Sequence, residues 1–206
     1  AVWRGGFTKK IRIRLCEISA ENPDQLDAKL VEDPARQENL KHLIGNRFSF
    51  EDFLNYKYLP NVTGTMASSP ALQWRLLSNS VTLQQVTDEI QWFYRALKPY
   101  VHYVPVKDDL SDLLEQIQWS KDHDDLCKQI ADNATEFALN NLMTEDIYLY
   151  FYLVLNRYSS LQHLSKEVEQ ETLKDPRWAK IQSRKAQKKK AKAEGLKGYN
   201  RSFTPF

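Results

Sequence analysis

The chain has 206 residues, of which 42% are hydrophobic and 12% aromatic, so it has enough apolar material for a substantial core and does not belong to the disordered class. Its formal net charge of +2 is too small to indicate general nucleic-acid binding, and we expect no nucleic-acid partner. Two cysteines, Cys16 and Cys127, are too few for a disulfide framework, and no apolar run approaches the roughly 18 residues of a membrane span, so we expect no transmembrane segment.

The amino-terminal stretch reads Ala1-Val2-Trp3-Arg4-Gly5-Gly6 and follows a strand-to-loop pattern. It has no initiator Met and no charged-then-apolar signal pattern. We therefore expect a fragment of a longer protein.

Short apolar runs alternate with polar connectors in the next part of the chain. Residues 56–62, 80–86 and 101–106 are each predicted to form a buried strand. Between the first two strands, Ser68-Ser69-Pro70 combines a serine cap with proline at the first helical position, and leucines follow at helical spacing. This order of strand, loop, helix and strand predicts an α/β fold with an open parallel sheet.

Three helices are predicted after Pro105. The first helix has Asp109 or Ser111 as its cap, and its apolar positions are Leu110, Leu113, Leu114 and Ile117. The second includes residues 126–137, and the third starts at Thr144. Four aromatic residues gather on the third helix: Tyr148, Tyr150, Phe151 and Tyr152. A ligand platform is the alternative, but aromatic residues at helical spacing are more often core, and we expect core packing.

The carboxyl-terminal part changes in composition. From about residue 165 the apolar period fades, and residues 184–192 contain six basic residues and no acidic one. We therefore divide the chain into a folded domain, residues 1–163, and a basic helical or disordered tail, residues 164–206. A solvated tail is the preferred interpretation, and contact with an anionic membrane or RNA is the alternative.

Two segments have the residue types that bind phosphate groups. In Arg4-Gly5-Gly6-Phe7-Thr8, followed by Arg12, the glycines allow close approach of the backbone and the arginine forks suit phosphate oxygens. Surface arginines beside an ordinary loop are the alternative. In the second segment, residues 64–70 enter a helix whose first N–H groups favour an anion, although the glycine spacing fits neither the Walker nor the dinucleotide-binding motif.

A pair of carboxylates, Asp88 and Glu89, follows the second predicted strand. Open α/β sheets bind ligands beyond the carboxyl ends of their strands, where carboxylates can accept hydrogen bonds from ribose or sugar hydroxyls. Helix capping is the alternative for Asp88. His102 lies between apolar residues, and a core histidine and a catalytic histidine remain alternatives. The four histidines have no ligand spacing, so we expect no metal site.

Several segments between residues 2 and 161 occur in a specific order. They are Trp3-Arg4-Gly5 with Thr8 and Arg12, Asn22-Pro23 with Asp27-Ala28, Tyr56-Lys57-Tyr58-Leu59 with Asn61 and Gly64, Leu76-Leu77-Ser78-Asn79-Ser80, and Trp92-Phe93-Tyr94. The most specific run is Leu97-Lys98-Pro99 followed by His102-Tyr103-Val104-Pro105-Val106. In this order the segments resemble glycosyltransferase family 90, which includes capsule-associated, lipopolysaccharide-modifying and protein O-glucosyltransferase members.

The resemblance implies a GT-B fold of two Rossmann-like halves, with this chain as the carboxyl-terminal, donor-binding half. It implies an enzyme that transfers glucose or xylose from a UDP-sugar to a hydroxyl of a protein or glycan, without a metal or other cofactor. It also implies the amino-terminal half of the same enzyme as a partner, and a location in the endoplasmic reticulum lumen or Golgi.

Site residues follow from the resemblance position by position. Contacts to the donor diphosphate are implied for Arg4, Gly5, Thr8, Arg12, Gly64 and Ser69. Contacts to the uracil, ribose or sugar are implied for Ser49, Phe50, Asp88 and Glu89. The family's general base is an aspartate of the first half, so we expect it upstream of Ala1 and name no catalytic residue here.

One departure from the family concerns the diphosphate contacts. Many members have an arginine two residues after the serine that matches Ser69, and this chain has Ala71. Losing such a fork costs on the order of 1.5–3 kcal/mol if nothing replaces it, and Arg75 or Lys57 are the candidate replacements. A non-catalytic member that binds a nucleotide sugar or acts as a scaffold is therefore the alternative function.

Overall fold

The computed structural model describes residues 1–31, 38–65 and 69–162, together with residues 170, 171, 173–177, 183, 186 and 190. The chain divides into two compact units, Ala1–Tyr150 and Phe151–Phe206. The predicted boundary at residue 163 lies outside the described residues, as does the basic run 184–192 except for residues 186 and 190.

The first ladder of the amino-terminal unit joins β1 (Val2–Gly5) and β2 (Asp27–Leu30) in parallel, with Val2 opposite Asp27. Helix α1 (Lys10–Glu21) makes the crossover between them. The buried hydroxyl of Ser19 on α1 donates to the carbonyl of Leu26 and accepts from the amide of Ala28. This side chain fixes the end of α1 against the start of β2, and the sequence analysis identified neither element.

The second ladder contains β3 (Tyr58–Asn61), β4 (Val81–Gln85) and β5 (Val104–Val106), all parallel in the order β3-β4-β5. All three predicted strands are confirmed, with shorter ends than expected. Strand β1 lies close to β3, but β1–β2 and β3–β4–β5 are separate ladders, so the single continuous sheet is not confirmed. Pro60 in the middle of β3 has no amide hydrogen, which limits the ladders that this strand can form.

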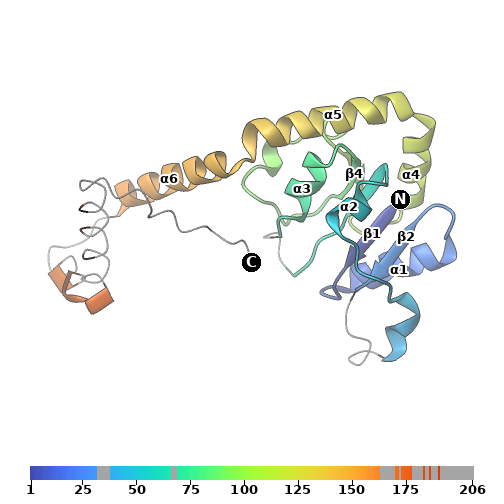
Figure 1. Cartoon of the computed structure of the whole chain (residues 1–206), viewed down its shortest axis with the longest axis horizontal. Coiled ribbons are helices and arrows are strands. Elements are labelled where there is room, and N and C mark those ends of the chain that lie inside the picture. The colour runs from blue at the N-terminus through green and yellow to red at the C-terminus, as the bar shows by residue number, and fades with distance from the viewer. Residues whose placement is uncertain are drawn as a thin grey trace. The chain divides into compact units, whose positions relative to one another are not determined.

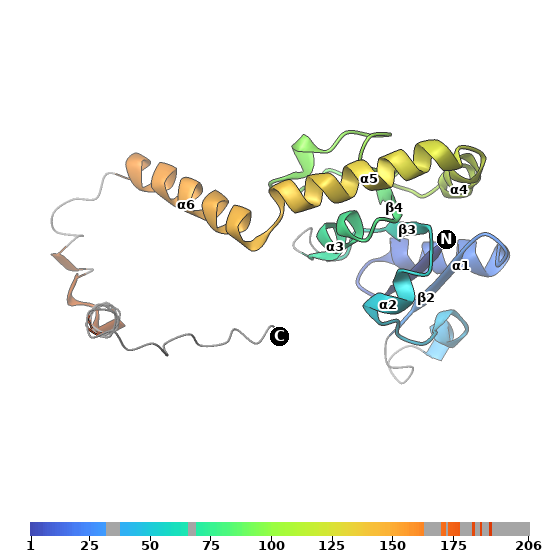
Figure 2. The same ribbon diagram turned by 45° about the horizontal axis from the view of Figure 1, so that its top comes forward.

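Helices cover the second ladder. Helix α3 (Ala71–Leu77) connects β3 to β4, and α4 (Leu113–Asp122) and α5 (Asp124–Asn141) follow β5. Helix α5 lies against α3, as Figures 1 and 2 show from two sides. One buried cluster includes Leu15, Leu83, Val104 and Ile117, so both ladders share a hydrophobic core.

The start of α4 differs from the prediction. Leu110 has a φ of 61° and lies before the helix, which is a left-handed conformation that a leucine in a helix cannot adopt. The carboxylate of Asp109 accepts from the amide of Ser111, and Asp112 occupies the N-cap position. Neither predicted cap therefore begins the helix.

Helix α6 (Thr144–Leu161) begins at the predicted residue. The prediction that its aromatic residues form core is wrong, because Tyr148, Phe151 and Tyr152 are more than half exposed. Tyr150 instead stacks on Trp92, with ring centroids 4.5 Å apart. Helical spacing of apolar residues predicts a helix, but it does not show whether another element packs against those residues. Within the described part of the chain, no helix is long and apolar enough to cross a bilayer.

Shorter elements complete the amino-terminal unit. They are the 3-10 helices η2 (Glu38–Leu43) and η3 (Tyr94–Ala96) and the single-turn helix α2 (Phe50–Phe53). Helix α2 precedes β3 and provides aromatic side chains beside the carboxyl ends of β1 and β3. This edge is where open α/β sheets bind ligands.

Candidate functional site

A cavity of about 510 Å³, which we call the first cavity, lies at this edge of the amino-terminal unit. Its size is typical of sites for small ligands. Its wall combines aromatic rings with arginines, and the residues that the argument uses are Arg4, Arg12, Phe48, Phe50, Trp74 and Arg75. Of the predicted site residues, Gly5, Ser49 and Ser69 also line it, so the structure brings together segments around residues 4, 49 and 69.

Arg4 lies in the wall of the first cavity but is bound to the protein. Its guanidinium forms a two-pronged ion pair with Asp27, with N–O distances of 3.0 and 2.6 Å. It also donates to the carbonyls of Trp3, Asp27 and Asn46 and lies 4.1 Å above the ring of Phe48. Arg4 therefore links β1, β2 and the segment before α2, and it positions Phe48 in the cavity wall.

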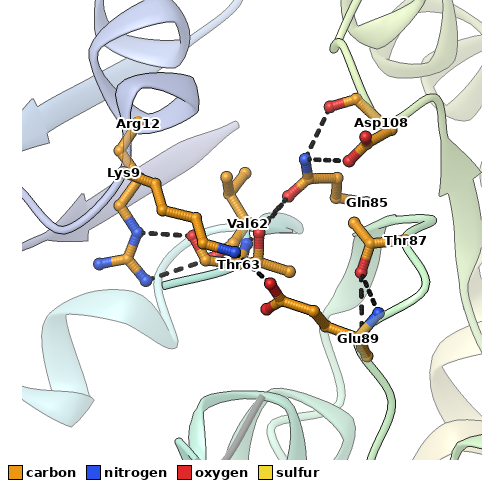
Figure 3. Close-up of polar contacts among 8 residues, drawn as sticks. All are labelled: Lys9, Arg12, Val62, Thr63, Gln85, Thr87, Glu89 and Asp108. Atoms are coloured by element: carbon orange, nitrogen blue, oxygen red, sulfur yellow. Dashed lines mark hydrogen bonds and ion pairs between the residues drawn. The ribbon is translucent and has the colours of Figure 1, made fainter. Parts of the chain in front are cut away.

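The Arg12 guanidinium extends from α1 toward the segment that follows β3, as Figure 3 shows. It donates to the carbonyls of Gly6, Val62 and Thr63 at 2.9, 3.2 and 3.0 Å. These three hydrogen bonds to backbone carbonyls hold the guanidinium in place.

Two other predicted residues, Thr8 and Gly64, flank this guanidinium. A Cβ at position 64 would lie 2.9 Å from Nη2 of Arg12 and 3.3 Å from Oγ1 of Thr8. Glycine at this position leaves room for the Arg12 guanidinium, which any larger residue would displace. Gly5 has a similar role beside Trp3, whose Cζ2 would be 2.5 Å from an added Cβ.

The predicted uracil segment forms the start of α2. Ser49 caps the helix by accepting from the amide of Asp52, and the Asp52 carboxylate accepts from the amide of Ser49. This reciprocal capping box fixes the direction of the next residue, Phe50. The Phe50 ring is 65% exposed and lies edge-on to Trp74, with centroids 5.5 Å apart.

Ser69 lies at the turn into α3, where its hydroxyl accepts from the amide of Ala71 at 3.3 Å. Its carbonyl accepts from the side chain of Gln91, which in turn accepts from Gln73. The start of α3 is therefore tied to the loop that follows β4.

Arg75, one turn after Ala71, is a cavity residue whose position the sequence analysis left open. It is only 4% exposed, and its guanidinium carbon lies 4.4 Å from the centre of the Trp74 ring. Burial, and to a smaller extent the neighbouring charge of Arg12, lowers the pKa of Arg75 to about 9. The available sequence signal was an arginine on the same helical face as Leu72 and Leu76, which are also buried.

Asp88 and Glu89 lie elsewhere, in a second cavity of about 520 Å³. Glu89 forms an ion pair with Lys9, which reaches across from the start of α1 beside Thr63 (Figure 3). Gln85 joins the ends of three strands, because its carbonyl oxygen accepts from Thr63 and its amide donates to Asp108. The segment Val62–Thr63 therefore contributes to both cavities, one residue to each.

His102 lies in a turn, and its Nδ1 accepts from the amide of Lys98 at 3.0 Å. Burial lowers its pKa, and the charge of Lys98 adds to this effect. The ring therefore stabilises the turn before β5. Among the described residues, no group of three His, Cys, Asp or Glu side chains is arranged to hold a metal ion.

Comparison with known proteins finds one matching family model and several similar proteins. The family model described as glycosyl transferase family 90 matches residues 1–203. Protein O-glucosyltransferase 2 of Danio rerio is 38% identical over 162 residues, which are 78% of this chain and 32% of that protein. Protein O-glucosyltransferase 3 of Homo sapiens is 38% identical over 82% of this chain and 33% of that protein. Protein O-glucosyltransferase 1 of Rattus norvegicus is 35% identical over 77% of this chain and 41% of that protein. The chain spans about a third of the length of the first two relatives.

Proposed function

Because the chain belongs to glycosyl transferase family 90, we propose that it is the donor-binding half of a glycosyltransferase and holds a UDP-sugar across its two cavities. The relatives are named protein O-glucosyltransferases, which supports glucose as the sugar and a protein hydroxyl as the acceptor. Xylose as the sugar and a glycan hydroxyl as the acceptor are proposed from the family resemblance alone. The observation that supports this proposal best is the first cavity, where arginines and aromatic rings occupy the wall of one space.

In this proposal the diphosphate lies beside Arg12, near Ser69. Thr8 and Gly64 act indirectly, since they leave the space that Arg12 occupies. Gly5 and Arg4 shape the wall, because Gly5 accommodates Trp3 and Arg4 supports Phe48. Arg4 would contact a phosphate directly only by giving up its ion pair with Asp27.

The uracil then lies against Ser49 and Phe50. The capping box at Ser49 orients Phe50 before a ligand arrives, and its exposed ring has a face available for stacking. Preorganised aromatic side chains of this kind bind a planar base at low entropic cost.

The sugar extends past Val62–Thr63 into the second cavity. There the carboxylates of Asp88 and Glu89 accept hydrogen bonds from sugar or ribose hydroxyls. The ion pair with Lys9 orients the Glu89 carboxylate, whose oxygens are hydrogen-bond acceptors.

The reaction proposed for the whole protein is a single displacement, in which a carboxylate takes the proton of the acceptor hydroxyl as that oxygen attacks the anomeric carbon. The bond from the anomeric carbon to the diphosphate breaks, and Arg12 stabilises the negative charge that develops on the departing UDP. We also propose the remainder of the enzyme as a partner and the endoplasmic reticulum or Golgi as the location, both from the family resemblance.

Isothermal titration of the 206-residue chain with UDP, uridine and pyrophosphate tests the donor site. We expect UDP to bind more tightly than either fragment. Phe50→Ser should weaken UDP and uridine and spare pyrophosphate, because it removes only the aromatic face. Arg12→Met should weaken UDP and pyrophosphate and spare uridine. A folded wild-type chain that binds none of the three ligands would exclude this function and favour the scaffold alternative.

A further inference from the structure

The side chain of Arg75 is an unusual component of the first cavity, because it is a buried cation. In the described part of the chain, no carboxylate pairs with it. Its Nη1 donates to the side chain of Asn61 at 3.2 Å and to the carbonyl of Ala71 at 3.0 Å. Its Nε is buried and has no hydrogen-bond partner among the residues that the structure describes.

This arrangement is costly. An ion removed from water needs an opposite charge or a full set of hydrogen bonds. Arg75 has neither, and the positive charge of Arg12 is close enough to repel it. An anion between the two guanidinium groups would relieve both the unsatisfied Nε and the repulsion.

We propose that Arg75 is a direct ligand of the donor diphosphate and takes over the position that Ala71 leaves without a cation. The Arg75 side chain extends toward the start of α3, where its guanidinium donates to the carbonyl of Ala71. The positive charge of Arg75 therefore lies near residue 71. The inference rests on the proposed function, since it assigns a residue to the same diphosphate site.

The other candidate replacement, Lys57, lies elsewhere. Its side chain is 69% exposed and pairs with Asp124 at 2.7 Å, and it is not among the residues that line the first cavity. Lys57 therefore serves as the control: a cation of the same chain outside the site.

A structural role for Arg75 predicts different behaviour. Arg75 donates to Asn61, and Asn61 donates to Gln84, so the guanidinium is also the first donor in a chain of buried hydrogen bonds. If Arg75 serves only that chain, its removal should lower stability and leave ligand affinity unchanged. If it is a diphosphate ligand, removal should lower affinity while stability is retained, because an unpaired buried charge has been removed.

The test measures thermal unfolding and pyrophosphate titration for wild type, Arg75→Met, Arg75→Gln and Lys57→Met. We expect Arg75→Met to melt at or above the wild-type temperature and to bind pyrophosphate at least about tenfold more weakly, as expected for a lost charge-assisted bond. Lys57→Met should change affinity by less than about twofold. Wild-type affinity in Arg75→Met would overturn the inference.

Arg75→Gln covers the case in which Arg75→Met does not fold. Glutamine has no charge but retains an amide that can donate to Asn61. Weak pyrophosphate binding by this variant supports the inference, and wild-type binding overturns it. Binding of UDP also separates the two proposals. If wild type binds pyrophosphate through Arg75 but does not bind UDP, the donor function fails while the anion ligand stands. If wild type binds UDP and Arg75→Gln binds it equally well, the donor function stands and the assignment of Arg75 as a diphosphate ligand fails.

Discussion

The Gly64→Ala substitution tests whether Gly64 exists to make room for the Arg12 guanidinium. An added Cβ would lie 2.9 Å from Nη2 of Arg12 and 3.3 Å from Oγ1 of Thr8. Arg12 must then shift, and the nitrogen nearest to the new methyl group donates to the Val62 carbonyl at 3.2 Å. The substitution should therefore act mainly on one of the three carbonyl bonds of Arg12.

The expected cost follows from two opposing effects. A lost hydrogen bond to a charged group costs about 1.5–3 kcal/mol, and we take the lower end because the bond is displaced rather than left in a dry core. Gly64 does not adopt a left-handed conformation, so alanine also stabilises by about 0.4–1 kcal/mol through the unfolded state. The free energy of unfolding should fall by about 1 kcal/mol in the wild-type background.

Arg12→Met supplies the matched background, since methionine lacks the atoms that the new Cβ would meet. There Gly64→Ala should be neutral or stabilise by about 0.5 kcal/mol, which gives a coupling free energy of about 1.5 kcal/mol in a double-mutant cycle. Urea unfolding of the four proteins at neutral pH measures the cycle. The same effect of Gly64→Ala in both backgrounds, or stabilisation in the wild type, would refute the steric explanation.

Three further predictions concern one ion pair and two single side chains. Arg4→Met and Asp27→Asn should couple by about 1 kcal/mol in urea unfolding, a value reduced because the Asp27 side chain is 42% exposed, and independent effects would show that the ion pair adds nothing. Burial raises the pKa of Cys16 to about 12, so a disulfide reagent at pH 8 should modify Cys16 only after unfolding; labelling of the folded protein would contradict this. Burial lowers the pKa of His102 below its ordinary value of 6.5, so the unfolded state takes up a proton first and stability should fall as the pH drops through about 6.5. His102→Gln should flatten that part of the stability profile, and an unchanged slope would assign the effect to other groups.

The strands of the second ladder were predictable because the pattern of apolar residues within each strand is enough to identify it. Buried apolar runs bounded by turn residues determined β3, β4 and β5 to within a few residues. The start of α4 was not predictable from periodicity, since Leu110 has an apolar side chain at a helical position but a left-handed backbone. The side chain of Leu110 is buried in the shared core, so burial and helical conformation are separate properties there.

The grouping of three candidate segments around one cavity was predictable, but the contacts of their side chains were not. The family resemblance implied that Arg4, Arg12 and Ser69 contact one ligand, and all three lie in the wall of the first cavity, whereas Asp88 and Glu89 line the second. Nothing in the sequence indicated that Arg4 forms an ion pair with Asp27, because the two residues are 23 positions apart. Likewise, Glu89 meets Lys9 across 80 residues. Long-range pairing depends on the crossover of α1, which the sequence analysis did not detect.

The location of both cavities follows from the break between the two ladders. Strands β1 and β3 approach each other without joining one ladder. Beyond their ends the Arg12 side chain, and not backbone hydrogen bonds, connects the two segments. It binds the carbonyl of Gly6 after β1 and those of Val62 and Thr63 after β3, while Gln85 of β4 holds the amide of Thr63. The same side chain thus connects the sheets and lines the first cavity. Loss of ligand binding in an Arg12 variant is therefore evidence for a direct contact only if its unfolding free energy is measured alongside.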